Sequence, residues 1–163
     1  MQWTDLAFTL DDDLAEDVAG AWDWLITEPW RPVICSMFGG LFLEKQSGGV
    51  FWLECATAEV EQVGEDAASF HAFLSDPLAA GWQERVDTWF LPQFVELLHA
   101  AGKRPGPEEC FGFTILPVFA EGGYRVDNTF IAPRHEWLSY TGVVHRQIVH
   151  VPPGDKVRMA PKR

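Results

Sequence analysis

Three cysteines and five histidines are the residues of this chain that could carry metal or covalent chemistry, and they are scattered along it. No pair of cysteines forms a CxxC motif, and His145 and His150 are five residues apart, which puts them on different faces of a helix. His135 precedes Glu136, but no histidine stands three residues beyond that glutamate, as the zinc-protease helix motif requires. We therefore expect neither a metal site nor a bound cofactor.

Nucleophilic catalysis would depend on Cys110, which starts an apolar run and would need a histidine close to it in space. The alternative, which we favour, is that Cys110 is a small apolar residue buried in the core. The chain has no GxSxG elbow and no P-loop, and no two of its acids are set apart as a glycosidase pair. We expect the protein not to be an enzyme.

The stretch from Glu109 to Phe130 combines an apolar run, a double glycine and an Asp-Asn pair. Asp127 and Asn128 can bond to nearby backbone groups, and Gly122 and Gly123 can adopt positive φ. We predict a hairpin corner that Asn128 pins. The alternative is a recognition surface.

Charge is distributed unevenly along the chain, whose formal net charge is −12. Residues 1–80 contain 15 acidic and two basic residues, whereas residues 81–163 contain nine acidic and ten basic ones. An acidic surface repels phosphate backbones and attracts basic proteins, so we exclude nucleic acid and expect a basic protein partner. The alternative is that the acids only keep the protein soluble. The candidate partner-binding residues are Glu59, Glu61, Glu65 and Asp66.

The first part of the chain predicts a helix followed by a β-meander. Apolar residues recur at helical spacing from Leu14 to Leu25, Asp11 can cap the helix, and Pro29 and Pro32 end it. The acids at 11–13 are therefore interpreted as a helix start and not as a metal site. Three strands are predicted near residues 37–45, 49–54 and 58–63, separated by glycine-rich and small-residue turns. The last of these strands is expected to expose an acidic face to water.

Residues 65–102 predict a short helix, whose apolar face includes Phe70, and then a longer one. Asp76 would cap the longer helix, with Pro77 at its first position. Pro92 would kink or split this helix, and the glycine at its end would terminate it. Its predicted apolar stripe consists of Leu78, Trp82, Val86, Trp89, Phe90, Leu97 and Leu98.

The last part of the chain predicts a hairpin followed by a helix. A strand over residues 110–119, interrupted at Pro117, leads through an EGG turn to a returning strand over residues 124–132. Residues 134–151 have the periodicity of an amphipathic helix, which PPGDK closes before a basic tail.

These elements predict an α+β fold: a mainly antiparallel twisted sheet, built from a β-meander and a hairpin, with helices packed on it. We expect one domain over residues 1–163, with a helical segment at 1–30, a main part at 33–157 and a tail at 158–163. No signal peptide and no run of about 18 uncharged apolar residues is visible, so we expect a cytoplasmic protein without membrane association.

Short motifs follow one another in a specific order between residues 33 and 157. They are Phe38-Gly39, Trp52-Leu53, Glu59 to Val63, Phe70 to Leu74, Cys110-Phe111-Gly112-Phe113, Pro117, Gly122-Gly123, Asn128, His145-Arg146-Gln147-Ile148 and Pro153-Gly154. In this order they resemble the C-terminal domain of the bacterial type VI secretion immunity proteins that neutralise DNase-type effectors. The chain departs from the family pattern in having FAEGG in place of LGG and Ala58-Glu59 in place of Gly-Glu.

The resemblance implies a binding protein without turnover, which neutralises a basic, nuclease-type toxin by steric and electrostatic occlusion. The alternatives are a cytoplasmic scaffold or regulatory domain and, least favoured, a Cys/His enzyme. The resemblance also implies architectural roles for Phe38, Gly39, Trp52, Gly122, Gly123, Asn128 and Gln147.

Overall fold

The computed structural model describes residues 1–152 and confirms the α+β fold. Five antiparallel strands form a sheet in the order β1-β2-β3-β4-β5, so each strand pairs with the next one along the chain. A separate antiparallel pair contains β6 and β7. The strands are β1 (Ala7–Phe8), β2 (Trp30–Ser36), β3 (Gly40–Lys45), β4 (Val50–Glu54), β5 (Glu59–Gly64), β6 (Glu109–Phe113) and β7 (Thr129–Pro133).

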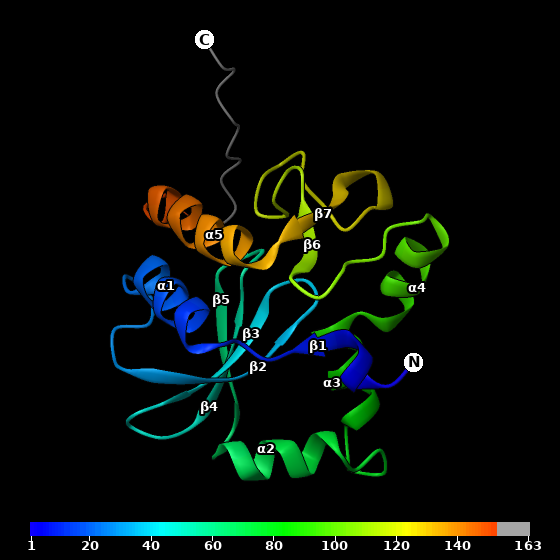
Figure 1. Ribbon diagram of the computed structural model, residues 1–163. Coiled ribbons are helices and arrows are strands. Elements are labelled where there is room, and N and C mark those ends of the chain that lie inside the picture. Colours follow the sequence, from blue (N-terminus) through cyan, green and yellow to red (C-terminus); the bar gives the residue numbers. More distant parts are fainter. Residues whose placement is uncertain (153–163) are drawn as a thin grey trace.

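The five-stranded sheet lies between two groups of helices (Figure 1). α1 and α5 lie side by side on one side of the sheet, and α2 and α3 lie on the other. The helices are α1 (Asp12–Trp22), α2 (Ala67–Leu74), α3 (Trp82–Phe90), α4 (Pro92–Ala100) and α5 (Arg134–Ile148), with short 3-10 turns η1 (Trp3–Leu6) and η2 (Val126–Asn128).

Phe42 on β3 is the centre of an aromatic core on the α2–α3 side of the sheet. Its ring centroid lies 4.9 Å from that of Phe70 on α2, and 5.3 Å and 5.7 Å from Trp89 and Phe90 on α3. Trp52, its cross-strand partner on β4, lies 6.4 Å away. Each such ring pair contributes about 1 kcal/mol of stability beyond that of burying apolar area. This cluster therefore fixes both helices on the sheet.

On the opposite side, indole hydrogen bonds join the end of α1 and the turn after it to α5. Nε1 of Trp22 donates to the carbonyl of Leu138 at 3.0 Å, and Nε1 of Trp24 donates to that of Gly142 at 3.1 Å. Gly142 leaves no room for a side chain, since a Cβ there would lie 2.6 Å from the carbonyl oxygen of Ala21. The close approach of the two helices therefore depends on this glycine.

Two helix boundaries agree with the sequence prediction. The carboxylate of Asp11 accepts a hydrogen bond from the backbone N–H of Leu14 at 2.8 Å and so caps α1. The acids at 11–13 are thus the start of a helix, as expected. Pro92 splits the long helix into α3 and α4, with Leu91 between them in the left-handed conformation at φ +50°.

β2 is not predicted from the sequence. Pro29 and Pro32 are expected to end a helix, but α1 ends well before them and Pro32 lies inside β2. The pairing of β2 with β3 shifts register between Pro32 and Ile34, and such an irregularity tolerates a residue that has no N–H to donate. β3 starts later than predicted because residues 37–39 form a turn, in which Gly39 has a φ of +85°.

The predicted helix start at Asp76-Pro77 is wrong. The carboxylate of Asp76 accepts from the N–H of Leu78 at 3.1 Å and closes a turn, and α3 begins only after Gly81, whose φ is +76°. Leu78 is 94% exposed and Leu97 is 60% exposed, so neither belongs to the apolar stripe. Asp76 accepts a backbone hydrogen bond as a capping residue would, but this bond closes a local turn and does not start a helix.

The β6–β7 hairpin confirms the second predicted sheet element, although its strands are shorter than expected. Residues 114–128 connect them, so the EGG sequence lies within a long loop and not in a tight turn. The N–H of Phe111 donates to the carbonyl of Met37 at 2.7 Å, and the Phe38 ring stacks on Phe111 at 5.0 Å and on Phe94 of α4 at 5.5 Å. These contacts join the hairpin to the central sheet and to α4.

Asn128 pins this loop, as predicted. Its side-chain amide accepts from the N–H of Ile115 at 3.0 Å and donates to the carbonyls of Ile115 and Gly123, both at 2.8 Å. Contrary to expectation, neither Gly122 nor Gly123 has a positive φ. Gly122 is required for space instead, because a Cβ there would lie 2.0 Å from the carbonyl oxygen of Leu116.

α5 confirms the predicted amphipathic helix, with Trp137, Leu138 and Thr141 buried, but it ends at Ile148. The PPGDK sequence beyond its first proline and the basic tail lie outside the described residues, as does the expected boundary at 157/158. None of the helices in residues 1–152 has the length and apolar character that crossing a membrane requires.

Replacing Asn128 with alanine should lower the free energy of unfolding by about 3 kcal/mol, because the buried loop loses one acceptor and two donors. Urea unfolding followed by tryptophan fluorescence measures this loss. Asp127→Ala is the matched control, since Asp127 forms only an exposed ion pair with Arg125 and should contribute less than about 1 kcal/mol. Equal stabilities of the two variants would contradict the assignment.

Candidate functional site

β5 is an edge strand whose side chains are exposed over most of its length. Among the described strands it pairs only with β4, so one row of its backbone N–H and C=O groups points away from the sheet. Glu59, Val60, Glu61 and Gln62 are all exposed, which confirms the predicted acidic face and extends the exposed surface to both sides of the strand. Charged side chains on an edge strand disfavour pairing with other copies.

The four predicted partner-binding residues are exposed and lie on β5 and the turn after it. They do not have the same role. Glu59 and Glu61 lie on the same side of β5, and Glu65 lies in the turn that follows. Asp66 caps α2: its carboxylate accepts from the backbone N–H of Ser69 at 2.7 Å, and this bond lowers the pKa of the carboxyl. Asp66 therefore serves the helix first, and substituting it would disturb α2 as well as the surface.

A groove of about 410 Å³ separates the β5 edge from α3. Glu61 reaches it from β5, while Glu84, Arg85, Thr88 and Trp89 reach it from α3. The guanidinium of Arg85 lies 5.4 Å from the centre of the Trp89 ring, so the one cation of the groove is stacked on its aromatic floor. We call this feature the β5–α3 groove.

α3 adds acids that are not among the sequence-predicted residues. Glu84 lies in the β5–α3 groove, and Asp87 follows one helical turn later, where it accepts from Gln83 at 2.9 Å. Both acids belong to the half of the sequence whose charge is nearly balanced. Glu84 is exposed, but only the packing of α3 against the sheet brings it beside Glu61.

Glu54 is a buried carboxyl at the end of β4. Its Oε1 accepts from the backbone N–H of Ala56 at 3.1 Å. Burial raises the pKa of Glu54 from 4.5 to about 7, and the Glu59 carboxylate contributes in the same direction. Burial and these two carboxyls also raise the pKa of the nearby Tyr124 phenol. The acidic surface therefore continues inward to the Glu54 carboxyl, which titrates in the neutral pH range.

His145 is a structural histidine on α5. It is buried, its Nε2 lies 3.0 Å from the carbonyl oxygen of Cys55, and its ring centroid lies 5.7 Å from that of Trp22. Burial lowers its pKa, so the ring is neutral and can donate Nε2–H to that carbonyl. His145 thereby ties α5 to the turn between β4 and β5.

The three cysteines are free and buried, and Cys110 is thus a buried residue of the core, as expected. Burial raises the pKa of the Cys35 and Cys55 thiols well above their ordinary value, and raises that of Cys110 from 9.0 to about 12. A thiol with such a pKa supplies almost no thiolate at neutral pH. This counts against Cys110 as a catalytic nucleophile.

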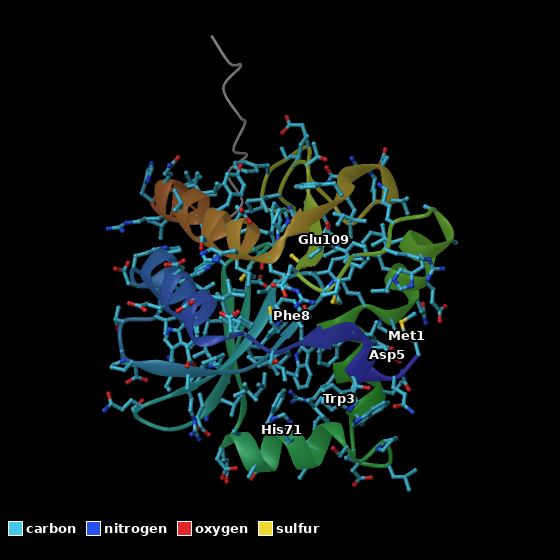
Figure 2. All side chains as sticks on the ribbon, viewed as in Figure 1. Met1, Trp3, Asp5, Phe8, His71 and Glu109 are labelled. Carbon is cyan, nitrogen blue, oxygen red and sulfur yellow. The ribbon has the colours of Figure 1, made fainter. Side chains whose placement is uncertain are left out.

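The remaining histidines do not gather. His71 lies on α2 at the edge of the molecule (Figure 2), and His135 pairs with Asp17 of α1. Within residues 1–152, no group of three His, Cys, Asp or Glu side chains is arranged to hold a metal ion.

The residues to which the resemblance gives architectural roles differ in their burial. Phe38 and Trp52 are buried, and Gly39 has a positive φ and lies against α5, where a Cβ would be 3.1 Å from Leu138. Gln147, in contrast, is exposed on α5. The architectural role implied for Gln147 stays a prediction, and the described contacts give it no support.

No model of a known protein family matches this chain, and a search of curated proteins gave no significant match. The resemblance to the type VI immunity proteins therefore rests on the order of short motifs alone.

Glu54 should make the stability of the protein pH-dependent. Because its pKa is higher in the folded protein than in the unfolded chain, the folded state binds the extra proton, and stability falls as the pH rises from 5 to 8. The full effect of this group is roughly 3 kcal/mol. Glu54→Gln keeps the acceptor for the Ala56 N–H, so this variant should lose the dependence.

The measurement is urea unfolding of both proteins at several pH values. The difference in unfolding free energy, variant minus wild type, should increase toward pH 8. His145, whose pKa shift has the opposite sign, is present in both proteins and cancels. The control is Glu96→Gln, at an exposed position on α4. The assignment would be contradicted if the difference in unfolding free energy between Glu54→Gln and wild type depended on pH as little as it does for this control.

The three thiols should be unreactive in the folded protein. We expect a chromogenic disulfide reagent to modify all three at least about 100-fold more slowly in the native protein than in urea, because each thiol is inaccessible and protonated. A fast-reacting thiol in the native protein, assigned with Cys110→Ser, would instead restore the Cys/His enzyme hypothesis.

Proposed function

We propose that this protein is a non-catalytic, cytoplasmic binding protein that neutralises a basic, nuclease-type toxin by covering the toxin's nucleic-acid-binding surface. The observation that carries the proposal is the acidic surface formed by the exposed edge strand β5 and the outer face of α3, with Glu59, Glu61 and Glu84 at its centre.

The charge of the molecule supports a basic partner. Residues 1–152 contain 23 acidic and eight basic residues, a formal charge of −15. A nuclease needs a basic surface to hold the phosphate backbone. An inhibitor of opposite charge associates faster with that surface and prevents substrate from reaching it.

The shape of the surface supports protein binding and not small-molecule turnover. β5 offers unpaired backbone groups along an exposed edge, and the β5–α3 groove beside it can accept side chains of a partner. The resemblance to type VI secretion immunity proteins points in the same direction, and the free buried cysteines suit a reducing compartment.

The proposal predicts a complex that depends on charge. Tagged protein should capture a basic partner from a lysate of the native cells, and added protein should inhibit the nuclease activity of that partner at equal molar ratio. Raising the salt concentration should weaken the complex.

Charge reversal locates the interface. Glu59→Lys, Glu61→Lys and Glu84→Lys together should weaken binding at least tenfold, an order of magnitude typical of losing several complementary charges. The control reverses the same number of charges elsewhere, with Glu16→Lys, Glu96→Lys and Glu108→Lys at other exposed positions. Equal binding by both triple variants would reject this surface, and no inhibited nuclease among the captured proteins would reject the function.

A further inference from the structure

A second groove, of about 560 Å³, lies between the β6–β7 hairpin and α5. Its lining includes the rings of Phe130, Trp137 and Tyr140 and the side chain of Glu136. It shares no lining residue with the β5–α3 groove. We call it the aromatic groove.

The three rings form walls that are not parallel. Phe130 and Trp137 lie 5.7 Å apart at an interplanar angle of 86°, and Trp137 and Tyr140 lie 6.0 Å apart at 35°. Phe130 is 41% exposed and Tyr140 is 52% exposed, so both present aromatic surface to an incoming group. Tyr140 falls outside the buried stripe of α5, although an aromatic residue on a helix surface usually gains by being buried.

This combination has the chemistry of a cation site. The face of an aromatic ring attracts a positive charge, and several rings around one space attract it together. Glu136, exposed at the edge of the groove, adds a full negative charge that can pair with the same cation.

The nearest cations of the chain are engaged elsewhere. Arg134 starts α5, but its guanidinium lies 3.7 Å from the ring centre of Phe8, near the middle of the molecule in Figure 2, and its Nε donates to the carbonyl of Glu109 at 2.9 Å. His135 is turned to Asp17. Among the described residues, none of the cation–π contacts involves the three rings of the aromatic groove.

We propose that the aromatic groove binds a cationic side chain of a partner protein, with arginine preferred over lysine. The planar guanidinium can stack on a ring and pair with Glu136 at the same time, whereas an ammonium group does so less well. Nucleic acid and anionic lipid are disfavoured as occupants because the described residues carry a formal charge of −15. The site uses other elements than β5 and α3, so it does not depend on the function proposed above.

Nuclear magnetic resonance tests this directly with a small probe and the full chain. Nα-acetyl-arginine amide should produce saturable shifts of the Trp137 indole resonance, which Trp137→Phe identifies, with a dissociation constant in about the millimolar range. The matched neutral probe is Nα-acetyl-citrulline amide, which has nearly the same shape without the charge. It should bind at least about fivefold more weakly.

Two variants and two matched controls assign the binding to the groove. Tyr140→Leu and Glu136→Gln change exposed residues and should each weaken arginine binding by about threefold or more. Tyr124→Leu changes the other tyrosine of the chain and Glu96→Gln another exposed glutamate, and both should bind the probe like the wild type.

Four results would overturn the proposal, and the first three concern the probes and the variant. These three are the absence of saturable shifts, equal affinities for the arginine and citrulline probes, and unchanged binding by Tyr140→Leu. Binding that appears only after Lys156, Arg158, Lys162 and Arg163 are changed to glutamine would also overturn it, since the occupant would then be the chain's own basic tail.

Discussion

The packing of aromatic rings around Phe42 is the constraint on which the rest of the structure depends. Phe42 lies on the central strand of the meander and contacts rings from α2 and α3, so it fixes where both helices sit on the sheet. The packing of Trp89 holds α3 there and brings Glu84 opposite Glu61, beside β5, which is the last strand of the sheet. The acidic surface is therefore a consequence of how the apolar core is filled.

Several buried polar groups of the described residues are engaged in hydrogen bonds within the fold. His145 is engaged with the carbonyl of Cys55, Glu54 with the N–H of Ala56, and Asn128 with two segments of its own loop. Each of these groups fixes a connection between elements. The two grooves on which the proposals rest lie at the surface and differ in kind: one is flanked by acids, and the other combines three rings with a single carboxylate.

Local signals in the sequence predicted the elements that local interactions decide. Asp11, Pro92 and Asn128 act on residues near them in the chain, and the structure uses all three as expected. The failures have long-range causes. Pro32 fits a strand because β2 and β3 shift register beside it, and Gly122 is demanded by the approach of another part of the loop.

The candidate site was predictable only in part, for the same reason. The acids of β5 and of the turn after it lie within eight residues of sequence, so their exposure follows from one polar segment. Glu84 joins them only through the fold, and Phe130 meets Tyr140 only because β7 runs into α5.

The central claim is that the β5–α3 surface binds a basic protein, and hydrogen–deuterium exchange of the protein with and without its captured partner tests it most directly. We expect protection to be concentrated at residues 59–64 and 82–90; protection confined to α1 would contradict the claim.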